Sequence, residues 1–350
     1  MRSVLYALFG ASFTLATAWA LGALVLRKLS LSLAAIEERM LAFIAGSACL
    51  SAVVLVLCSV GLARKSVFLV VGSAAILAVT RPGAHRRGEP LPPLPRVWKW
   101  LFVMVFAVFM AVYLVRALAP EVIPDAATHR LSLMDQAHGF IRNAGNLKGS
   151  QGFELLLLYA FAFGRRPAAA VVGLGFLASL TLLLVSYGRR MGYPAVGIGA
   201  ALLTCAGFLA LQHDLSGAGI TIVLFALYYV LRVWDQQGAR ELLVLAGILA
   251  GFSYAANYAA IAALPGALAF VTGKLWRKRQ PVFPPARTLC VPALTFMLPW
   301  IMKDAILGFH DAGMAGTGWL MPVLPFASLA SLLALSRLPR LFAALRNVAR

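Results

Sequence analysis

The chain has 350 residues, of which 61% are hydrophobic and 12% are charged, and its mean hydropathy is +0.86. Soluble domains carry about 25% charged residues, so this composition excludes an ordinary soluble domain and predicts a polytopic membrane protein. The formal net charge is +19, and the densest clusters of Lys and Arg lie between apolar runs. That placement is typical of basic membrane loops that face anionic lipid, and it argues against nucleic acid as a partner.

The predicted elements begin with an apolar run, 4–26, that follows Arg2. Its 23 residues exceed the apolar segment of a signal peptide, so we interpret it as a retained span. Further runs approach the ~20 residues that cross a bilayer as a helix. They predict an all-α, polytopic integral membrane protein with about 10–11 transmembrane helices. These spans are expected at 40–63, 66–80, 100–118, 166–187, 193–212, 216–234, a split pair within 241–272, 288–307 and 319–335.

Basic residues between the spans predict the orientation. Three segments hold dense clusters of Lys and Arg with few acids, which places them in the cytoplasm by the positive-inside rule. Residues 189–190 and 235–240 fall on the same side, in agreement with the rule, whereas 64–65 and 165–166 fall outside, against it. The three basic segments are 81–99, 274–287 and 336–350.

Two predicted elements differ from simple spans. The stretch QGFELLLLYAFAFG, 151–164, is too short to cross, and we expect a juxtamembrane or re-entrant helix that closes the outer loop as a lid. The stretch 241–273 is too long for one helix, so we expect it to break around 253–257 and return to the cytoplasmic side. A broken helix at membrane depth lines protein or water, which predicts a cavity wall there.

Asp125 is the acid on which the functional hypothesis depends. It lies in an outer loop, 117–150, in a chain with only 12 acidic residues. Pro120 and Pro124 precede it, and a helix that continues through His138 is predicted after it. A helix cap and a catalytic role both fit this position, because Asp is a strong N-cap and ionisable groups at the membrane boundary are often functional.

Asp214, in a second outer loop, is the acid that we pair with Asp125. Two such carboxylates can bind a hard divalent cation, or one of them can take a proton from an acceptor hydroxyl while cations hold a departing phosphate. The residues of the outward-facing polar set that are expected to bind substrate are His129, Arg130, Gln151, Glu154, His213 and Lys303.

Three short motifs follow one another along the outer side of the predicted bundle. They are PE-x-x-PD-x-x-T-H-x-L at 120–131, QG-x-E-x-L-x-L-x-AFAFG at 151–164 and PW-x-x-K at 299–303. In this order they resemble the GT-C superfamily of integral membrane glycosyltransferases, and are similar to its bacterial protein-mannosyltransferase-like branch. The resemblance covers 100–308, and the chain is a short and divergent example of the pattern.

The resemblance implies that a sugar passes from a polyprenyl-phosphate donor to an acceptor at the outer face of a bacterial inner membrane. It implies that Asp125 is the first-loop acid and Asp214 the later-loop acid. Pro299, Trp300 and Lys303 match a family Pro-Trp and Lys. Relatives carry Tyr-His where this chain has His129 and Arg130.

The leading hypothesis is a glycosyltransferase that works by single displacement. Asp125 is the base or orienter of the acceptor, Asp214 assists it or holds a metal, and Arg130 and Lys303 stabilise the lipid phosphate. The expected partners are the polyprenyl-phosphate sugar donor and membrane lipid. The sequence does not identify a cofactor. The one cofactor considered is a divalent metal ion held by Asp125 and Asp214.

Two other classes of function stay open. A membrane transporter or lipid flippase would use the broken helix for passage of its substrate, and a non-catalytic GT-C-like membrane protein would keep the fold without the chemistry. The expected division of the chain is into 1–99, N-terminal spans with a cytoplasmic basic linker, and 100–350, a GT-C-like membrane core.

Overall fold

The computed structural model describes residues 2–80, 88, 90–119, 126–140, 151–211 and 215–311. These residues form 11 α-helices and one short 3-10 helix, with no strand among them. Six of the described helices are long and apolar enough to cross a membrane. The predicted all-α, polytopic membrane fold is therefore confirmed. The predicted span 319–335 lies outside the described residues.

Apart from α5, which is polar, the helices follow the apolar runs of the sequence. They are α1 (Arg2–Leu29), α2 (Ala35–Ser59), α3 (Lys65–Thr80), α4 (Arg96–Leu118), α5 (Ala126–Ala137), α6 (Gly152–Arg190), α7 (Pro194–Leu211), α8 (Leu215–Gln237), α9 (Arg240–Ala256), η2 (Tyr258–Ala262), α10 (Ala263–Arg277) and α11 (Phe283–Asp311).

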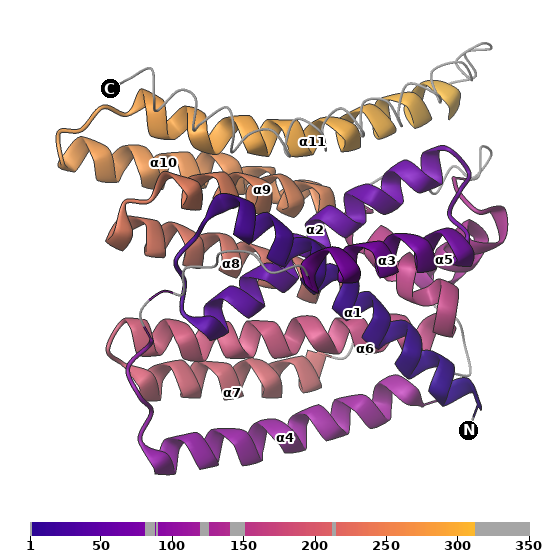
Figure 1. The fold of residues 1–350 in the computed structure, drawn as a ribbon, viewed down its shortest axis with the longest axis horizontal. Coiled ribbons are helices and arrows are strands. Elements are labelled where there is room, and N and C mark those ends of the chain that lie inside the picture. The colour runs from indigo at the N-terminus through magenta and orange to yellow at the C-terminus, as the bar shows by residue number, and fades with distance from the viewer. Residues whose placement is uncertain are drawn as a thin grey trace.

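Most helices run along a common axis (Figure 1). The centre of the bundle is made where α1 packs on α2 and α6, and where α9 packs on α8 and α11. Helices α1, α2 and α3 pack against α6, and one buried core cluster contains residues from both sides of the predicted boundary at 99. That boundary does not coincide with a break in the core of the described residues.

Helices α1 and α2 approach each other closely through two glycines. A Cβ built on Gly22 falls 1.6 Å from the Ala42 carbonyl oxygen, and one on Gly46 falls 1.7 Å from the Ala18 carbonyl oxygen. Neither position has room for a side chain, so the two backbones lie in direct contact. Small residues allow this close packing in membrane helices, where dispersion replaces the hydrophobic effect as the driving force.

Helix α6 contains two segments separated by a kink. Arg165 has φ 54° and ψ −149°, outside the helical region, and Pro167 follows it. The first segment, 152–164, is the stretch predicted to be too short to cross, and Figure 1 shows the chain changing direction after it. Nearly all of its residues are buried inside the protein. Burial fits the re-entrant alternative and not a lid that lies on the membrane surface.

The split helix breaks at Asn257, within the predicted range. Helix α9 ends at Ala256, and Asn257 adopts an extended conformation whose Oδ1 accepts a hydrogen bond of 2.9 Å from the Ala259 amide. This side-chain bond caps η2 and turns the chain back into α10. The break predicted from the length of 241–273 is confirmed.

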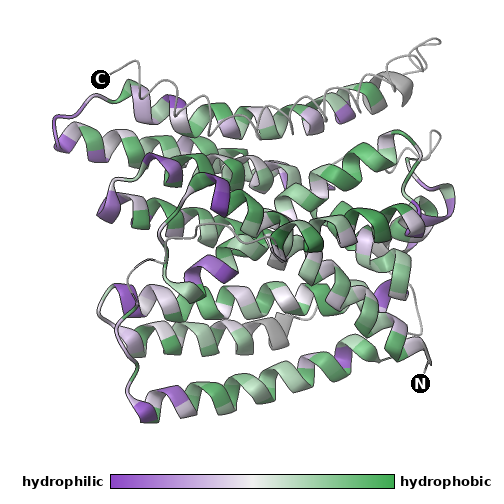
Figure 2. Cartoon of the chain, in the orientation of Figure 1, coloured by the Kyte–Doolittle hydropathy of each residue, from purple (hydrophilic) through white to green (hydrophobic). Residues whose placement is uncertain are grey.

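The bundle has two distinct ends. One is formed by the turns between α1 and α2, α6 and α7, α8 and α9, and α10 and α11, and by the chain leading into α4; we call it the basic end. The Arg189 guanidinium donates to the Leu91 and Pro92 carbonyls, at 3.0 and 2.9 Å, and joins two of these segments. Figure 2 shows hydrophilic residues gathered at this end of the helices. The described parts of the predicted basic segments 81–99 and 274–287 therefore lie at one end of the bundle, together with 189–190 and 235–240, whereas the third basic segment, 336–350, lies outside the described residues.

Candidate functional site

The predicted functional residues that the structure describes lie toward the opposite end of the bundle. Gln151 and Glu154 lie at the start of α6, and Lys303 lies near the end of α11. His129 is exposed on α5, and Arg130 is in the same helix. Asp125, His213 and Asp214 lie outside the described residues, so the pairing of the two acids stays a prediction.

The helices that lead into the two predicted acids end side by side. The Tyr113 hydroxyl, near the end of α4, donates a 2.7 Å hydrogen bond to the Cys205 carbonyl, near the end of α7. Helix α5 begins at Ala126, directly after Asp125, which confirms the helix predicted there. Leu131 and Met134 bury one face of α5 in the core, and the helix packs against α6.

The start of α6 is fixed by contacts to two helices distant in sequence. The Ser51 hydroxyl of α2 donates a 2.6 Å hydrogen bond to the Gly152 carbonyl. A Cβ on Gly152 would lie 2.8 Å from the Ala255 carbonyl carbon of α9, so only glycine fits this approach. These contacts hold Gln151 and Glu154 in the interior instead of at a mobile helix end.

Lys303 is the centre of a buried polar cluster. Its side chain is fully buried, and Nζ donates to Gln151 Oε1 at 3.2 Å and lies 3.0 Å from Asp304 Oδ1. The Glu154 carboxylate, in a residue 9% exposed, interacts electrostatically with Lys303. Because burying an isolated ammonium is very costly, these carboxylates and the amide oxygen are what keep Lys303 inside. Three residues predicted to bind substrate are therefore brought together.

Two buried N–H groups beside Lys303 lack acceptors. Gln151 Nε2 and Trp300 Nε1 have no hydrogen-bond partner among the described residues. The ring of Trp300 lies 5.9 Å from Lys303 Nζ, and Gln151 contacts the same ammonium. An unmet buried donor costs about 1–3 kcal/mol. These two donors would be satisfied by a ligand that carries oxygen acceptors.

Asp304 and Trp300 belong to this cluster, although neither is among the predicted site residues. Asp304 is 24% exposed and forms its open edge, whereas Trp300 is fully buried. Trp300 precedes Lys303 by three residues, so helical spacing alone indicates that the two share a face. Asp304 directly follows Lys303 within the predicted span 288–307, and an acid beside a lysine in an apolar run is a second signal.

A second buried cluster lies at the basic end and was not predicted. The fully buried Glu37 forms a bidentate salt bridge with Arg190. Arg190 Nη2 donates to Glu37 Oε2 at 2.6 Å, and Arg190 Nε donates to Glu37 Oε1 at 2.8 Å. The Tyr229 hydroxyl donates to the same carboxylate, and the Ala34 amide donates to Oε2 at 3.1 Å. Every oxygen of Glu37 is satisfied, which is typical of a structural clamp between helices.

The described residues contain no group of three or more His, Cys, Asp or Glu side chains placed to hold a metal ion. The two acids predicted as metal ligands, Asp125 and Asp214, are outside that set, so the metal hypothesis is untested. Comparison with known proteins finds no matching family model, no matching curated protein and no matching solved structure.

Proposed function

We propose that this protein is a membrane glycosyltransferase that moves a sugar from a polyprenyl-phosphate-linked donor to an acceptor at the end of the bundle opposite the basic end. In the cell this end faces the outside of a bacterial inner membrane. The observation that carries the proposal is the buried Lys303 ammonium with two N–H donors that lack acceptors beside it. A lipid phosphate offers oxygen acceptors to all three groups at once.

The charges of the cluster suit a site that is closed until the donor enters. Without donor, Asp304 at 3.0 Å and the neighbouring Glu154 balance Lys303. Asp304 is partly exposed, so it can turn toward water when a phosphate takes its place. Glu154 is nearly buried and stays as the local counter-charge. Exchange of one anionic partner for another avoids leaving a bare charge inside the protein.

The proposed reaction is a single displacement at the anomeric carbon. Asp125 takes the proton of the acceptor hydroxyl as the acceptor oxygen forms its bond to that carbon. The bond from the carbon to the phosphate oxygen breaks, and the electron pair leaves with the polyprenyl phosphate. Lys303 and Arg130 stabilise that leaving group, and Asp214 assists Asp125. Support for this placement is that α5, which starts directly after Asp125, packs on α6, which starts beside Gln151 and Glu154.

Binding of polyprenyl phosphate by the purified chain tests the proposal. Native mass spectrometry in detergent compares the binding of polyprenyl phosphate with that of uncharged polyprenol. It is applied to the wild type, Lys303→Met and Lys303→Arg. We expect wild type to bind the phosphate at least about tenfold more tightly than polyprenol, and Lys303→Met to lose this preference, because a hydrogen-bonded charge contributes about 1.5–3 kcal/mol. Lys303→Arg keeps part of it. Lys99→Met, which removes an exposed lysine from the basic end, is the matched control. Equal preference in wild type and Lys303→Met would overturn the proposal.

A lipid flippase is the second candidate, and the break at Asn257 is the feature that favours it. Discontinuous helices line the binding sites of many transporters. In proteoliposomes, a flippase moves labelled polyprenyl phosphate between leaflets without an acceptor, whereas a transferase consumes the sugar-linked lipid only when an acceptor is present. The two outcomes are distinguished by measuring lipid translocation and sugar transfer in one preparation.

A further inference from the structure

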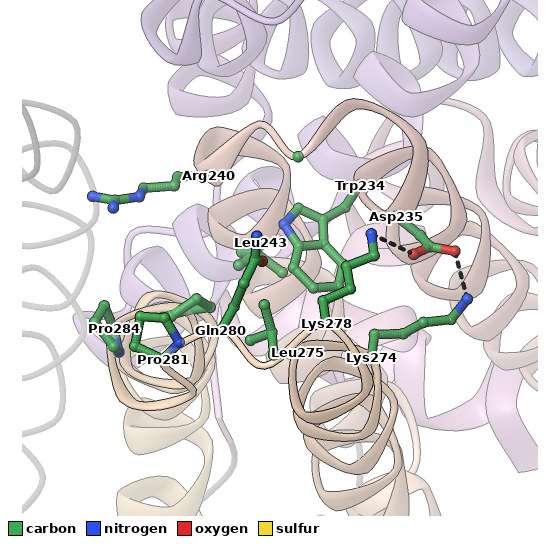
Figure 3. A pocket seen from close by; sticks show the side chains of 12 residues that line it. Trp234, Asp235, Arg240, Leu243, Lys274, Leu275, Lys278, Gln280, Pro281 and Pro284 are labelled. Carbon is green, nitrogen blue, oxygen red and sulfur yellow. Dashed lines mark hydrogen bonds and ion pairs between the residues drawn. The ribbon is translucent and has the colours of Figure 1, made fainter.

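A cavity with basic side chains in its walls lies at the basic end, away from the cluster around Lys303. It has a volume of about 320 Å³ and is bounded by the end of α8, the starts of α9 and α11, and the end of α10 (Figure 3). Its walls are formed by Trp234, Asp235, Gly238, Arg240, Leu243, Lys274, Leu275, Lys278, Gln280, Pro281, Pro284 and Pro285.

The charge of this cavity is predominantly positive. Three of its lining residues are basic, Arg240, Lys274 and Lys278, against one acid, Asp235. Asp235 binds both lysines, with Oδ2 at 2.8 Å from Lys274 Nζ and Oδ1 at 3.6 Å from Lys278 Nζ, and Figure 3 shows both turned toward it. An ammonium has three donor hydrogens, so each lysine keeps donors for another acceptor. Asp235 thus holds two cations in place along one wall.

An exposed tryptophan beside the cavity indicates that its mouth lies near the level of the lipid headgroups. Trp276 is 82% exposed and Phe283 is 77% exposed, and they flank the segment that lines the mouth. Trp and Tyr side chains of membrane proteins gather at the level of the lipid headgroups. Below this level, Leu294, Leu298 and Ile301 form an exposed apolar stripe along one face of α11. The helix that borders the cavity at its start therefore continues into a surface suited to contact with lipid chains.

We propose that this cavity binds the phosphate group of an anionic phospholipid from the leaflet at the basic end. Its volume is near the lower limit of about 300 Å³ for small-ligand sites, which suits a headgroup phosphate and glycerol but not a whole lipid. Basic pockets between membrane helices bind such headgroups. The bound phosphate contacts Lys274 and Lys278 at the end of α10 and lies against the starts of α9 and α11, which form the other walls. This site is independent of the glycosyltransferase proposal, because it lies at the other end of the bundle.

The test measures lipid binding to the full chain in detergent by native mass spectrometry. The probes are phosphatidylglycerol, cardiolipin, phosphatidylcholine and inorganic phosphate. We expect the wild type to retain the two anionic lipids over phosphatidylcholine. The double variant Lys274→Gln/Lys278→Gln should bind them roughly 25-fold more weakly, because each surface lysine changes the affinity for anionic lipid about fivefold. Arg96→Gln/Lys99→Gln removes two exposed cations from the same end but outside the cavity and should bind as wild type.

Three results would overturn the proposal. Equal weakening in both double variants would show general attraction of lipid to the basic end instead of a site. Competition by millimolar inorganic phosphate as strong as that by phosphatidylglycerol would assign the cavity to a soluble phosphate. Unchanged lipid binding in the Lys274→Gln/Lys278→Gln variant would exclude the cavity altogether. Thermal unfolding in phosphatidylcholine micelles is the control for folding. We expect the Lys274→Gln/Lys278→Gln variant to be folded, because Asp235 keeps Arg232 as a partner at 3.7 Å.

Discussion

Two buried charges in this protein have different surroundings, and the difference separates structure from function. Glu37 has a partner for each oxygen, supplied by Arg190, Tyr229 and a backbone amide. Lys303 shares its space with Gln151 and Trp300, whose N–H groups have no acceptor among the described residues. A satisfied network rigidifies a fold, whereas donors left without acceptors call for an explanation, and a ligand is one.

Substitution of Glu37 by Gln is expected to destabilise the protein by about 3–5 kcal/mol, because it leaves the charge of Arg190 without its counter-charge. Chemical denaturation in detergent measures the free energy of unfolding. Glu38→Gln is the control, since this neighbouring acid is only partly buried, and its cost is expected to stay below about 1 kcal/mol. Equal losses in the two variants would show that Glu37 has no special structural role.

Substitution of Asp125 separates the cap from the catalytic base. If Asp125 only caps α5, Asp125→Asn is nearly neutral and Asp125→Ala costs about 1 kcal/mol of stability, because Asn caps as well as Asp. Under our proposal Asp125→Asn also abolishes sugar transfer while stability stays near wild type, because an amide accepts no proton. Transfer from a lipid-linked donor is measured beside thermal stability for the Asn, Ala and Glu variants. Retained transfer in the Asn variant would leave the cap as the only role.

At the scale of single elements, the lengths of the apolar segments and the breaks between them were sufficient to predict most of the helices. The break at Asn257 followed from a stretch too long for one helix, and the separation of 152–164 from the next span followed from its length. Its burial did not follow, because it depends on contacts such as that of Ser51 with Gly152, which are 101 residues apart. The hydropathy of an apolar helix is the same whether the helix faces lipid or lies inside the protein. It therefore could not predict that 152–164 is buried in the protein.

The contact of α1 with α2 gives a prediction at the same scale. Gly22→Ala is expected to destabilise the protein by about 1–3 kcal/mol, because the new methyl overlaps the Ala42 carbonyl and forces the helices apart. Gly199→Ala is the matched control on α7, where nothing lies within 4 Å of an added Cβ. It should be neutral or stabilise by up to about 1 kcal/mol, because Ala favours the helix. Thermal unfolding that is unchanged in Gly22→Ala would refute the direct backbone contact.

For the whole molecule, the sequence predicted which polar residues share an end of the bundle but not which of them touch. Gln151, Glu154 and Lys303 were placed on one side by counting spans, and the structure brings them into a single cluster. The Glu37 clamp had no such signal, since an acid at a helix start is also an ordinary dipole partner. The site residues Asp125, His213 and Asp214 stay predictions because they lie outside the described residues.

The orientation of the bundle is open to a direct test. On a background without Cys49, Cys58, Cys205 and Cys290, single cysteines are placed at His129 on α5 and at Arg279 at the basic end. Both positions are exposed. We expect an impermeant thiol reagent to label the His129→Cys variant in intact cells and the Arg279→Cys variant only after permeabilisation, because the positive-inside rule predicts that the basic end faces the cytoplasm. Labelling in the reverse order would invert the orientation and remove the outer-face site.

The most direct measurement for the proposed function is an experimental structure of the protein with polyprenyl phosphate bound. The account predicts the phosphate within hydrogen-bond distance of Lys303 Nζ, about 2.7–3.2 Å, with Gln151 and Trp300 donating to its oxygens and Asp304 turned away. It also predicts that the carboxylates of Asp125 and Asp214 face the sugar-bearing side of that phosphate. A phosphate bound elsewhere, with Lys303 still closed on Asp304, would contradict it.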